Sequence, residues 1–138
     1  MSNDILSPVL RVVPVPSDIN SNGHIFGGWV LAMMDRAGGI VAGRMADGRC
    51  ATVAIEAMEF IQPILLGDLI SIYASIERRG RTSIAIRLNV MAERDRGENQ
   101  VKVTTGVFTF VALDEDFRPR PLPVSVDPCA AASTLAHS

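Results

Sequence analysis

Asp35 is the residue of this sequence most able to do chemistry, because it lies within an apolar segment. It follows Met33 and Met34 in the proline-free stretch 27–45, where large apolar residues recur at the spacing of a helix. A carboxylate among apolar neighbours is costly unless it is paired or hydrogen-bonded. Partial desolvation would make it a good general base or nucleophile. The alternative is an ion pair with Arg36 or another arginine on a residual polar stripe of the helix.

The same predicted helix begins with two glycines, Gly27 and Gly28. Glycine allows a backbone or a ligand to approach closely, and the N–H groups of the first turn have no intrahelical partner. Together with the positive end of the helix dipole, these donors can stabilise a developing oxyanion. The alternative is that the two glycines only ease packing against a strand.

The distance between these two features limits how they can work together. Asp35 lies about two turns beyond the glycines, or ~11 Å along the helix axis, so one carbonyl group cannot contact both within a single chain. Either a long substrate spans the two positions, or a neighbouring subunit supplies one of them. The second explanation suits a chain with 48% hydrophobic residues and a mean hydropathy of +0.26. We expect another subunit to cover part of such a surface.

Other polar residues could belong to the same site. Asn20 can donate its amide to a carbonyl or orient a water, although it also suits an Asx turn in a loop rich in turn-forming residues. His24 could act as a base, but a single histidine before a helix is more often a structural residue than a catalyst. Thr52 and Glu56 are spaced to share one face of a predicted strand, where either could line a pocket.

Basic residues gather in one part of the chain. Seven of the thirteen Lys and Arg fall between Arg78 and Lys102, and Arg78, Arg79 and Arg81 surround one predicted turn. Because the net charge is −2, such a local patch suits a phosphorylated small ligand better than a polymer. The alternative is a solvated turn that protects a sheet edge.

The elements that would position these residues are one strand, one long helix and then four strands. Alternating apolar and polar residues predict the strands, which cover 9–15, 52–60, 70–77, 83–93 and 101–113. Gly80 and the segment 96–99 lie where hairpin turns belong. In the last strand one face is expected to carry Val101, Val103, Val107, Val111 and Leu113.

The fold class that follows is α+β. The helix is apolar nearly all round, which predicts burial on most sides. A long antiparallel sheet can bury such a helix by curling around it, because each strand twists. This is the hotdog arrangement. The alternative is a small open α+β sandwich, with the helix flat on one face.

Composition excludes several classes of protein. The length of 138 residues suits one domain, expected over 1–124, followed by an Ala/Ser-rich frayed tail at 125–138. A pI near 5.6 argues against nucleic-acid or anionic-membrane binding. Cys50 and Cys129 have no metal-ligand spacing, and we expect a buried thiol at Cys50 and a reducing cytoplasm. Neither a secretion signal nor a membrane span is expected.

The ordered set of motifs resembles a known family. The run Asn-x-x-Gly-x-x-Phe-Gly-Gly-Trp at 20–29, followed by Met34-Asp35, is similar to the hotdog-fold acyl-CoA thioesterases, and most of all to their YciA-like bacterial subgroup. Further similar segments, all within a resemblance from about Leu10 to Val124, are 60–63 leading to 67–68, 80–83 and 118–123.

The resemblance implies roles for particular residues. It places the catalytic aspartate at Asp35 and the active-site asparagine at Asn20, which meet across a dimer interface, with the N–H of Gly28 beside them. The implied substrate and CoA positions are Phe26, Gly27, Thr52, Arg79, Arg81, Thr82 and Ser83. The sequence departs from the family at His24, where these proteins carry aspartate.

The expected function is hydrolysis of an acyl-CoA thioester without a metal or a cofactor, since coenzyme A is part of the substrate. The N–H of Gly28 and Asn20 would polarise the thioester oxygen. Asp35 would then activate water or attack directly to form a mixed anhydride. The resemblance also implies a homodimer formed edge to edge, assembled as a trimer of dimers.

Two other functions are compatible with the same fold. A non-catalytic acyl-CoA sensor usually carries a DNA-binding extension, and none is expected here. A hotdog dehydratase needs a histidine and acid pair at the site, and the only histidines are His24 and His137. The sequence gives no preference for the length of the acyl chain.

Overall fold

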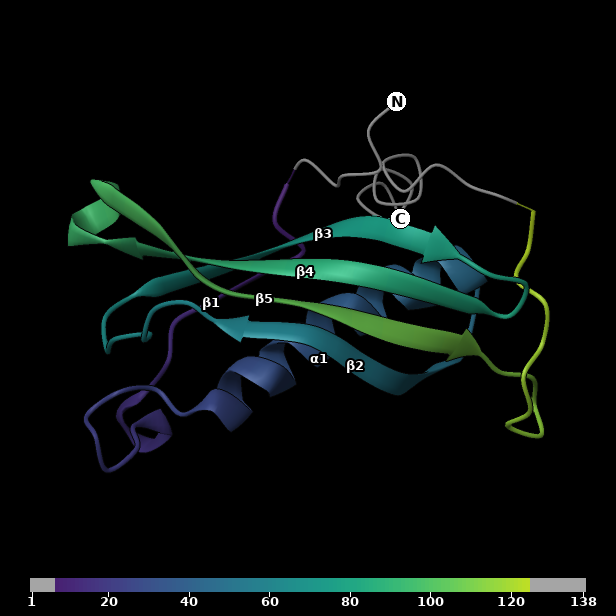
Figure 1. Cartoon of the computed structure of the whole chain (residues 1–138), viewed down its shortest axis with the longest axis horizontal. Helices are drawn as coiled ribbons and strands as arrows, with labels where there is room; N and C mark the ends of the chain where they lie inside the picture. The colour runs from purple at the N-terminus through teal and green to yellow at the C-terminus, as the bar shows by residue number, and fades with distance from the viewer. Residues whose placement is uncertain (1–6, 125–138) are drawn as a thin grey trace.

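The computed structural model describes residues 7–124, and it contains the predicted succession of one strand, one helix and four strands (Figure 1). The expected tail and Cys129 lie outside the described residues. The elements are β1 (Leu10–Val12), η1 (Pro16–Asp18), α1 (Gly27–Ala46), β2 (Cys50–Phe60), β3 (Leu69–Arg79), β4 (Ser83–Arg94), η2 (Asp95–Gly97) and β5 (Asn99–Ala112).

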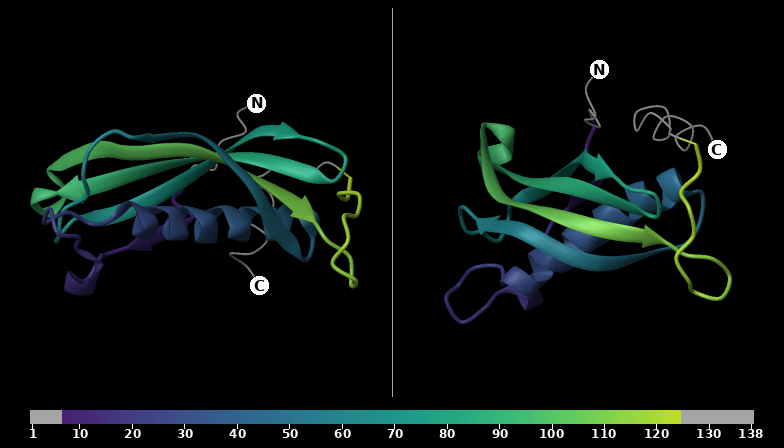
Figure 2. Two further views of the ribbon diagram at one scale, coloured as in Figure 1. Left: turned by 60° about the horizontal axis from the view of Figure 1, so that its bottom comes forward. Right: turned by 45° about the vertical axis from the view of Figure 1, so that its right-hand side comes forward.

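The five strands form one antiparallel sheet in the order β1-β3-β4-β5-β2. The predicted turns at Gly80 and at residues 96–99 connect β3 to β4 and β4 to β5. The sheet arches over α1, which lies along its concave side (Figure 2). This arrangement confirms the predicted curled sheet and is not the open sandwich. The strand β2 is at one edge of the sheet, next to β5.

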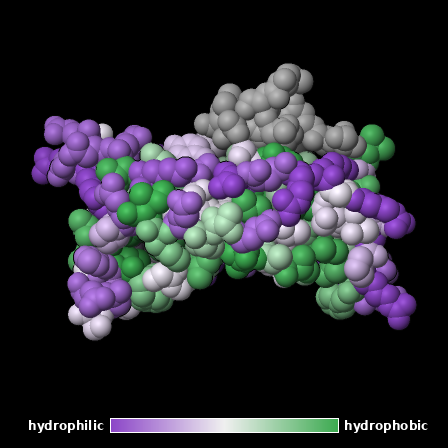
Figure 3. Space-filling model, viewed as in Figure 1, coloured by the Kyte–Doolittle hydropathy of each residue, from purple (hydrophilic) through white to green (hydrophobic). Residues whose placement is uncertain are grey.

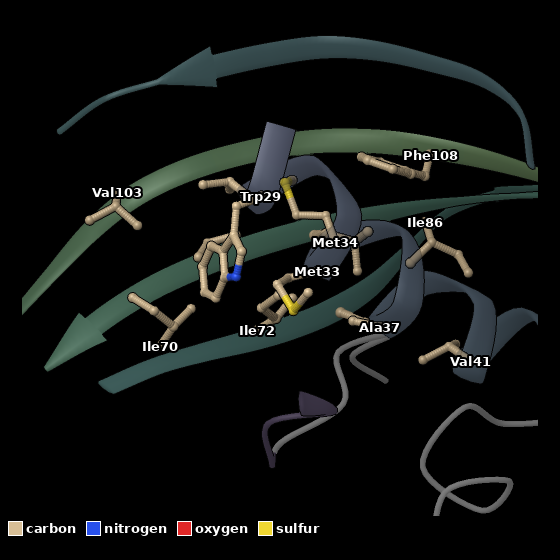
Figure 4. Packing of buried hydrophobic residues seen from close by; sticks show 14 of the residues in the cluster. Trp29, Met33, Met34, Ala37, Val41, Ile70, Ile72, Ile86, Val103 and Phe108 are labelled. Carbon is tan, nitrogen blue, oxygen red and sulfur yellow. The ribbon is translucent and has the colours of Figure 1, made fainter. Parts of the chain in front are cut away.

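The core forms where one side of α1 meets the inner face of the sheet. Figure 4 shows Trp29, Met33 and Met34 of the helix turned toward the isoleucines of β3 and β4. The expectation that α1 is buried on most sides is wrong for the single chain. Its other side is exposed along a stripe of Gly28, Ala32, Asp35, Arg36, Ile40 and Arg44.

A bulge in β5 changes which of its residues face the core. Val90 pairs with Thr104 and Met91 with Lys102, so Val103 is an extra residue in β5. An extra residue moves the side chains beyond it to the other face. The predicted common face for the odd-numbered apolar residues is therefore wrong, and the buried core cluster beyond the bulge contains Phe108 and Phe110 rather than Val107 and Val111.

A bulge in β2 separates two residues that the sequence places together. Thr52 pairs with Phe110, whereas Ala54 pairs with Thr109, so Val53 is an extra residue. Glu56 consequently lies opposite Val107, on the outer face, while Thr52 reaches the helix. The prediction that Thr52 and Glu56 share a face is wrong for this reason.

Two adjacent helix glycines provide a matched test of how tightly α1 packs. A Cβ atom on Gly38 would lie 2.7 Å from Cζ of Phe110, whereas one on Gly39 would have no neighbour within 4 Å. We expect Gly38→Ala to lower the free energy of unfolding by about 1–3 kcal/mol through overpacking. Gly39→Ala should raise it by about 0.5–1 kcal/mol, because alanine favours the helix. Urea unfolding of the two variants measures both, and equal midpoints would contradict the close contact.

Candidate active site

Asp35 is held at the edge of the sheet by a threonine rather than by an arginine. The hydroxyl of Thr52 on β2 donates to Oδ1 of Asp35 at 2.5 Å. No ion pair within residues 7–124 includes Asp35, so the alternative of a pair with Arg36 is wrong for the described chain. The second carboxylate oxygen has no protein donor among these residues, and it is open to water or a substrate.

The environment of Asp35 differs from the expected partly desolvated one. Its side chain is exposed in the single chain, on the helix stripe that faces away from the core. The expectation of desolvation is therefore wrong within one chain. Removing this carboxylate from water would require a second molecule that covers the stripe.

Asn20 is held by an Asx turn that uses its side-chain oxygen. Its Oδ1 accepts the backbone N–H groups of Asn22 at 2.9 Å and His24 at 3.1 Å. Its backbone N–H donates to the carbonyl of His24 at 2.7 Å. Because Oδ1 is occupied, Nδ2 is the free end of the amide, and no acceptor within the described residues engages it. The Asx turn expected at Asn20 is therefore present, and it is compatible with a donor role for Nδ2, which stays a prediction.

The two glycines at the start of α1 are not required by packing within the chain. A Cβ atom on Gly27 or Gly28 would meet only ordinary contacts, at 3.5 Å from Phe60 and 3.4 Å from Phe26. Phe26, the N-cap residue, has no side chain that could cap the helix N-terminus. The small size of these residues instead leaves room for something outside the chain to approach the first-turn N–H groups.

A hollow of about 280 Å³ lies beside Asn20, between the start of α1 and the end of β2. His24, Gly27 and Gln62 also line it. Its apolar lining includes Ile25, Val30, Phe60, Ile61 and Ile64. Asp35 is not among its lining residues, so a single chain presents the amide donor and the carboxylate at separate places. The hollow suits an apolar chain whose carbonyl group reaches Asn20.

Sequence reasoning missed the wall of this hollow. Residues 61–64 begin the loop between β2 and β3, and the apolar side chains of Ile61 and Ile64 resemble those of any connection between strands. The signs in the sequence were Gln62-Pro63, which ends the strand and turns the chain, and the similarity of the segment 60–63 to the family. His24, ranked low as a base, does line the hollow next to Asn20.

The predicted basic hairpin is only partly available to a ligand. Arg78 pairs with Glu56 at 2.8 Å, and Nη2 of Arg79 donates to the carbonyl of Pro123. Nη1 of Arg79 is buried and has no partner among the described residues. Arg81 is exposed, and its side chain forms no hydrogen bond or ion pair within residues 7–124. The hairpin backbone is closed by Gly80, whose N–H donates to the carbonyl of Ser83 at 2.8 Å.

Cys50, predicted to be a buried thiol, is only partly buried. Its Sγ donates to the carbonyl of Ala42 at 3.4 Å. Burial raises the pKa of the thiol, and the nearby charge of Arg120 opposes that rise. A protonated thiol of this kind is a poor nucleophile. Within residues 7–124, no cluster of three or more His, Cys, Asp or Glu could hold a metal ion.

None of the helices in residues 7–124 is long and apolar enough to cross a membrane.

Comparison with known proteins agrees with this geometry. The thioesterase superfamily matches residues 22–98. The acyl-CoA thioester hydrolase YciA of Salmonella typhimurium is 44% identical over 119 residues, covering 84% of this chain and 90% of that protein. Among solved structures, the hexameric thioesterase y2039 of Yersinia pestis has a TM-score of 0.82 and 40% identity, covering 86% of this chain and 96% of that one.

A second solved structure is HI0827, a hexameric broad-specificity acyl-coenzyme A thioesterase. It has a TM-score of 0.80 and 38% identity, covering 96% of this chain and 90% of that one. The chain belongs to the thioesterase superfamily, among its hotdog-fold acyl-CoA thioester hydrolases. The family and the fold predicted from the motifs are thus confirmed.

The hydroxyl of Thr52 gives a direct test of how Asp35 is held. Thr52→Val keeps the shape of the side chain but removes the donor to Asp35, and we expect thioester hydrolysis to fall about fivefold to tenfold. Thr52→Ser keeps the hydroxyl and should retain most of the activity. Release of free thiol from an acyl-CoA measures both variants. Equal activity of the two would show that the hydrogen bond does not hold the carboxylate in its working position.

Proposed function

We propose that the protein is an acyl-CoA thioesterase whose catalytic unit is a pair of chains, with Asp35 of one chain acting on a thioester bound beside Asn20 of the other. One observation carries this proposal. The Asp35 carboxylate and the Asn20 amide are each held by hydrogen bonds, but a single chain presents them at separate places.

The exposed edge of β2 is the surface that we propose to join two chains. Val53, Ile55 and Phe60 on this strand are 59%, 47% and 57% exposed. In Figure 3, hydrophobic surface lies along the lower margin of the molecule, where Figure 1 places β2. An unpaired apolar edge strand is a ready template for another strand. A second copy would cover both the edge and the apolar side chains.

One register of such a pair would bring the two halves of the site together. Two β2 strands paired antiparallel about a centre between Ile55 and Glu56 would place Thr52 of one chain opposite Glu59 of the other. The next residue, Phe60, lines the hollow that contains Asn20. Asp35, bonded to Thr52, would thus reach the partner's hollow and lose its contact with bulk water. A two-fold axis produces two such sites in each dimer.

The chemistry follows from the groups that meet there. Nδ2 of Asn20 and the N–H of Gly28 donate to the thioester oxygen as negative charge develops on it. In one route Asp35 takes a proton from water, the hydroxide adds to the carbonyl carbon, and the C–S bond breaks. The thiolate of coenzyme A then receives the proton. In the other route Asp35 adds directly, the thiolate leaves, and water hydrolyses the mixed anhydride. Incorporation of oxygen-18 into Asp35 during one turnover distinguishes the second route.

The coenzyme A portion is proposed to lie along the β3–β4 hairpin. Figure 1 shows this hairpin at the opposite end of the sheet from the start of α1. Two-fold pairing through β2 brings the hairpin of one chain toward the hollow of the other. Arg81, with Thr82 and Ser83 beside it, is the exposed cation that could pair with a phosphate.

The further proposals are a trimer of dimers, as hexameric relatives suggest, and a cytoplasmic location.

The first test removes only the charge of the proposed base. Asp35→Asn keeps the size of the side chain, and we expect turnover to fall about 10²-fold to 10⁴-fold, the usual contribution of acid–base catalysis. Free thiol released from acyl-CoAs of several chain lengths provides the measurement and also gives the chain preference. Glu98→Gln, which neutralises an exposed carboxylate far from α1 in the sequence, is the control. Near-normal turnover of Asp35→Asn would refute the assignment.

The second test asks whether the site is shared by two chains. Asn20→Asp keeps an acceptor for the Asx turn but removes the amide donor, so it and Asp35→Asn should each be nearly inactive alone. In a co-expressed mixture, half of the dimers are mixed and one of their two sites is intact. We therefore expect recovery of about a quarter of the wild-type turnover. No recovery in mixed dimers confirmed by mass spectrometry would place both residues in one chain's site.

A further inference from the structure

An ion pair between the buried Asp68 and the partly buried Arg94 lies next to the loop that forms the wall of the hollow. Asp68 comes just before β3 and is 3% exposed, and Arg94 is the last residue of β4. Nε of Arg94 donates to Oδ1 of Asp68 at 3.1 Å, and Nη2 donates to Oδ2 at 3.2 Å. This is the two-pronged geometry in which a guanidinium fixes the position of a carboxylate.

Both partners also bind the backbone of the loop between β2 and β3. Nη2 of Arg94 donates to the carbonyl of Pro63 at 2.6 Å. Oδ2 of Asp68 accepts the N–H of Leu65 at 2.9 Å, and the N–H of Asp68 donates to the carbonyl of Leu65 at 3.1 Å. The ion pair therefore fixes the loop on either side of Ile64 to the end of β4.

The next bonds run from this loop to Asn20. The carbonyl of Ile64 accepts the N–H of Ile25 at 3.0 Å. The residue before Ile25 is His24, whose backbone N–H and carbonyl both bond to Asn20. A short series of directional bonds thus connects Arg94 to Asn20.

Stability alone is a weak reason for such a pair. Removing two charges from water offsets much of their attraction, and apolar residues of similar volume often serve as well. What apolar residues cannot supply is the set of directional bonds to the Pro63 carbonyl and the Leu65 N–H. These bonds fix the position and the orientation of the loop that forms the wall of the hollow.

We propose that Asp68 and Arg94 are positioning residues, which act on thioester hydrolysis through Asn20 by fixing the loop 63–65. The effect on turnover rests on the proposed function, whereas the effect on the Asn20 amide does not. The principal variant is Arg94→Lys, which keeps the positive charge but lacks the planar fork that reaches both Asp68 and Pro63. The control is Glu93→Gln, which breaks the neighbouring Arg11–Glu93 pair of 3.5 Å without touching the loop.

The first readout is the side-chain amide of Asn20 in protein labelled with ¹⁵N-asparagine, assigned by its loss in Asn20→Asp. We expect Arg94→Lys to shift or broaden this resonance pair and Glu93→Gln to leave it unchanged. An unchanged Asn20 amide in folded Arg94→Lys protein overturns the proposal. This result does not depend on any activity, so it stands apart from a failure of the unaltered protein to hydrolyse acyl-CoA.

The second readout is a double-mutant cycle on turnover at saturating acyl-CoA. Arg94→Lys should lower turnover about tenfold when Asn20 is present and less than about twofold in the Asn20→Asp background. Glu93→Gln should change turnover less than about twofold in either background. If Arg94→Lys lowers turnover by the same factor in both backgrounds, its role is general stability and the proposal fails.

Discussion

Gly38 allows the ring of Phe110 to lie against the backbone of α1, and this contact fixes the rotation of the helix on the sheet. A Cβ atom there would come within 2.7 Å of the ring, so no other residue permits the same approach. Asp35 is three residues earlier, about 60° around the helix axis from Gly38. Its side chain therefore falls at the border of the buried side, where it meets Thr52 at the sheet edge. The position of the carboxylate follows from how the core packs.

Bulges in the edge strand β2 also determine where the side chains around Asp35 lie. The bulge at Val53 leaves Thr52 on the side of the helix and sends Glu56 to the outer face, where it pairs with Arg78. In a second irregularity, Ala57 adopts a positive φ of 55° and Met58 packs over Gly106. Bulges twist a strand and re-aim its side chains, and they are frequent next to active sites. An edge built this way carries one half of the proposed site at each end.

Much of the fold could be predicted from the sequence, because helix and strand periodicities are strong signals. The helix expected over 27–45 is Gly27–Ala46, and the hairpin at Gly80 is where glycine and polar residues interrupt two alternating runs. The faces of β2 and β5 could not be predicted, since one extra residue at Val53 or Val103 leaves no mark on the local composition. The exposure of Asp35 was missed for another reason. An apolar helix can be covered from several sides, by its own chain or by another molecule. Within a single chain the sheet covers only one side of α1.

Asn20 shows why a turn residue and a catalytic donor need not be alternatives. An Asx turn requires only an acceptor, which an aspartate would supply equally well. The turn formed here uses Oδ1 for two N–H groups and leaves the amide nitrogen without an acceptor among residues 7–124. In the proposed site the requirement for asparagine comes from the donor, while the turn removes the rotational freedom that a donor would otherwise lose on binding substrate. The loop 63–65 holds that turn from behind, which makes a segment without chemistry of its own part of how the site is oriented.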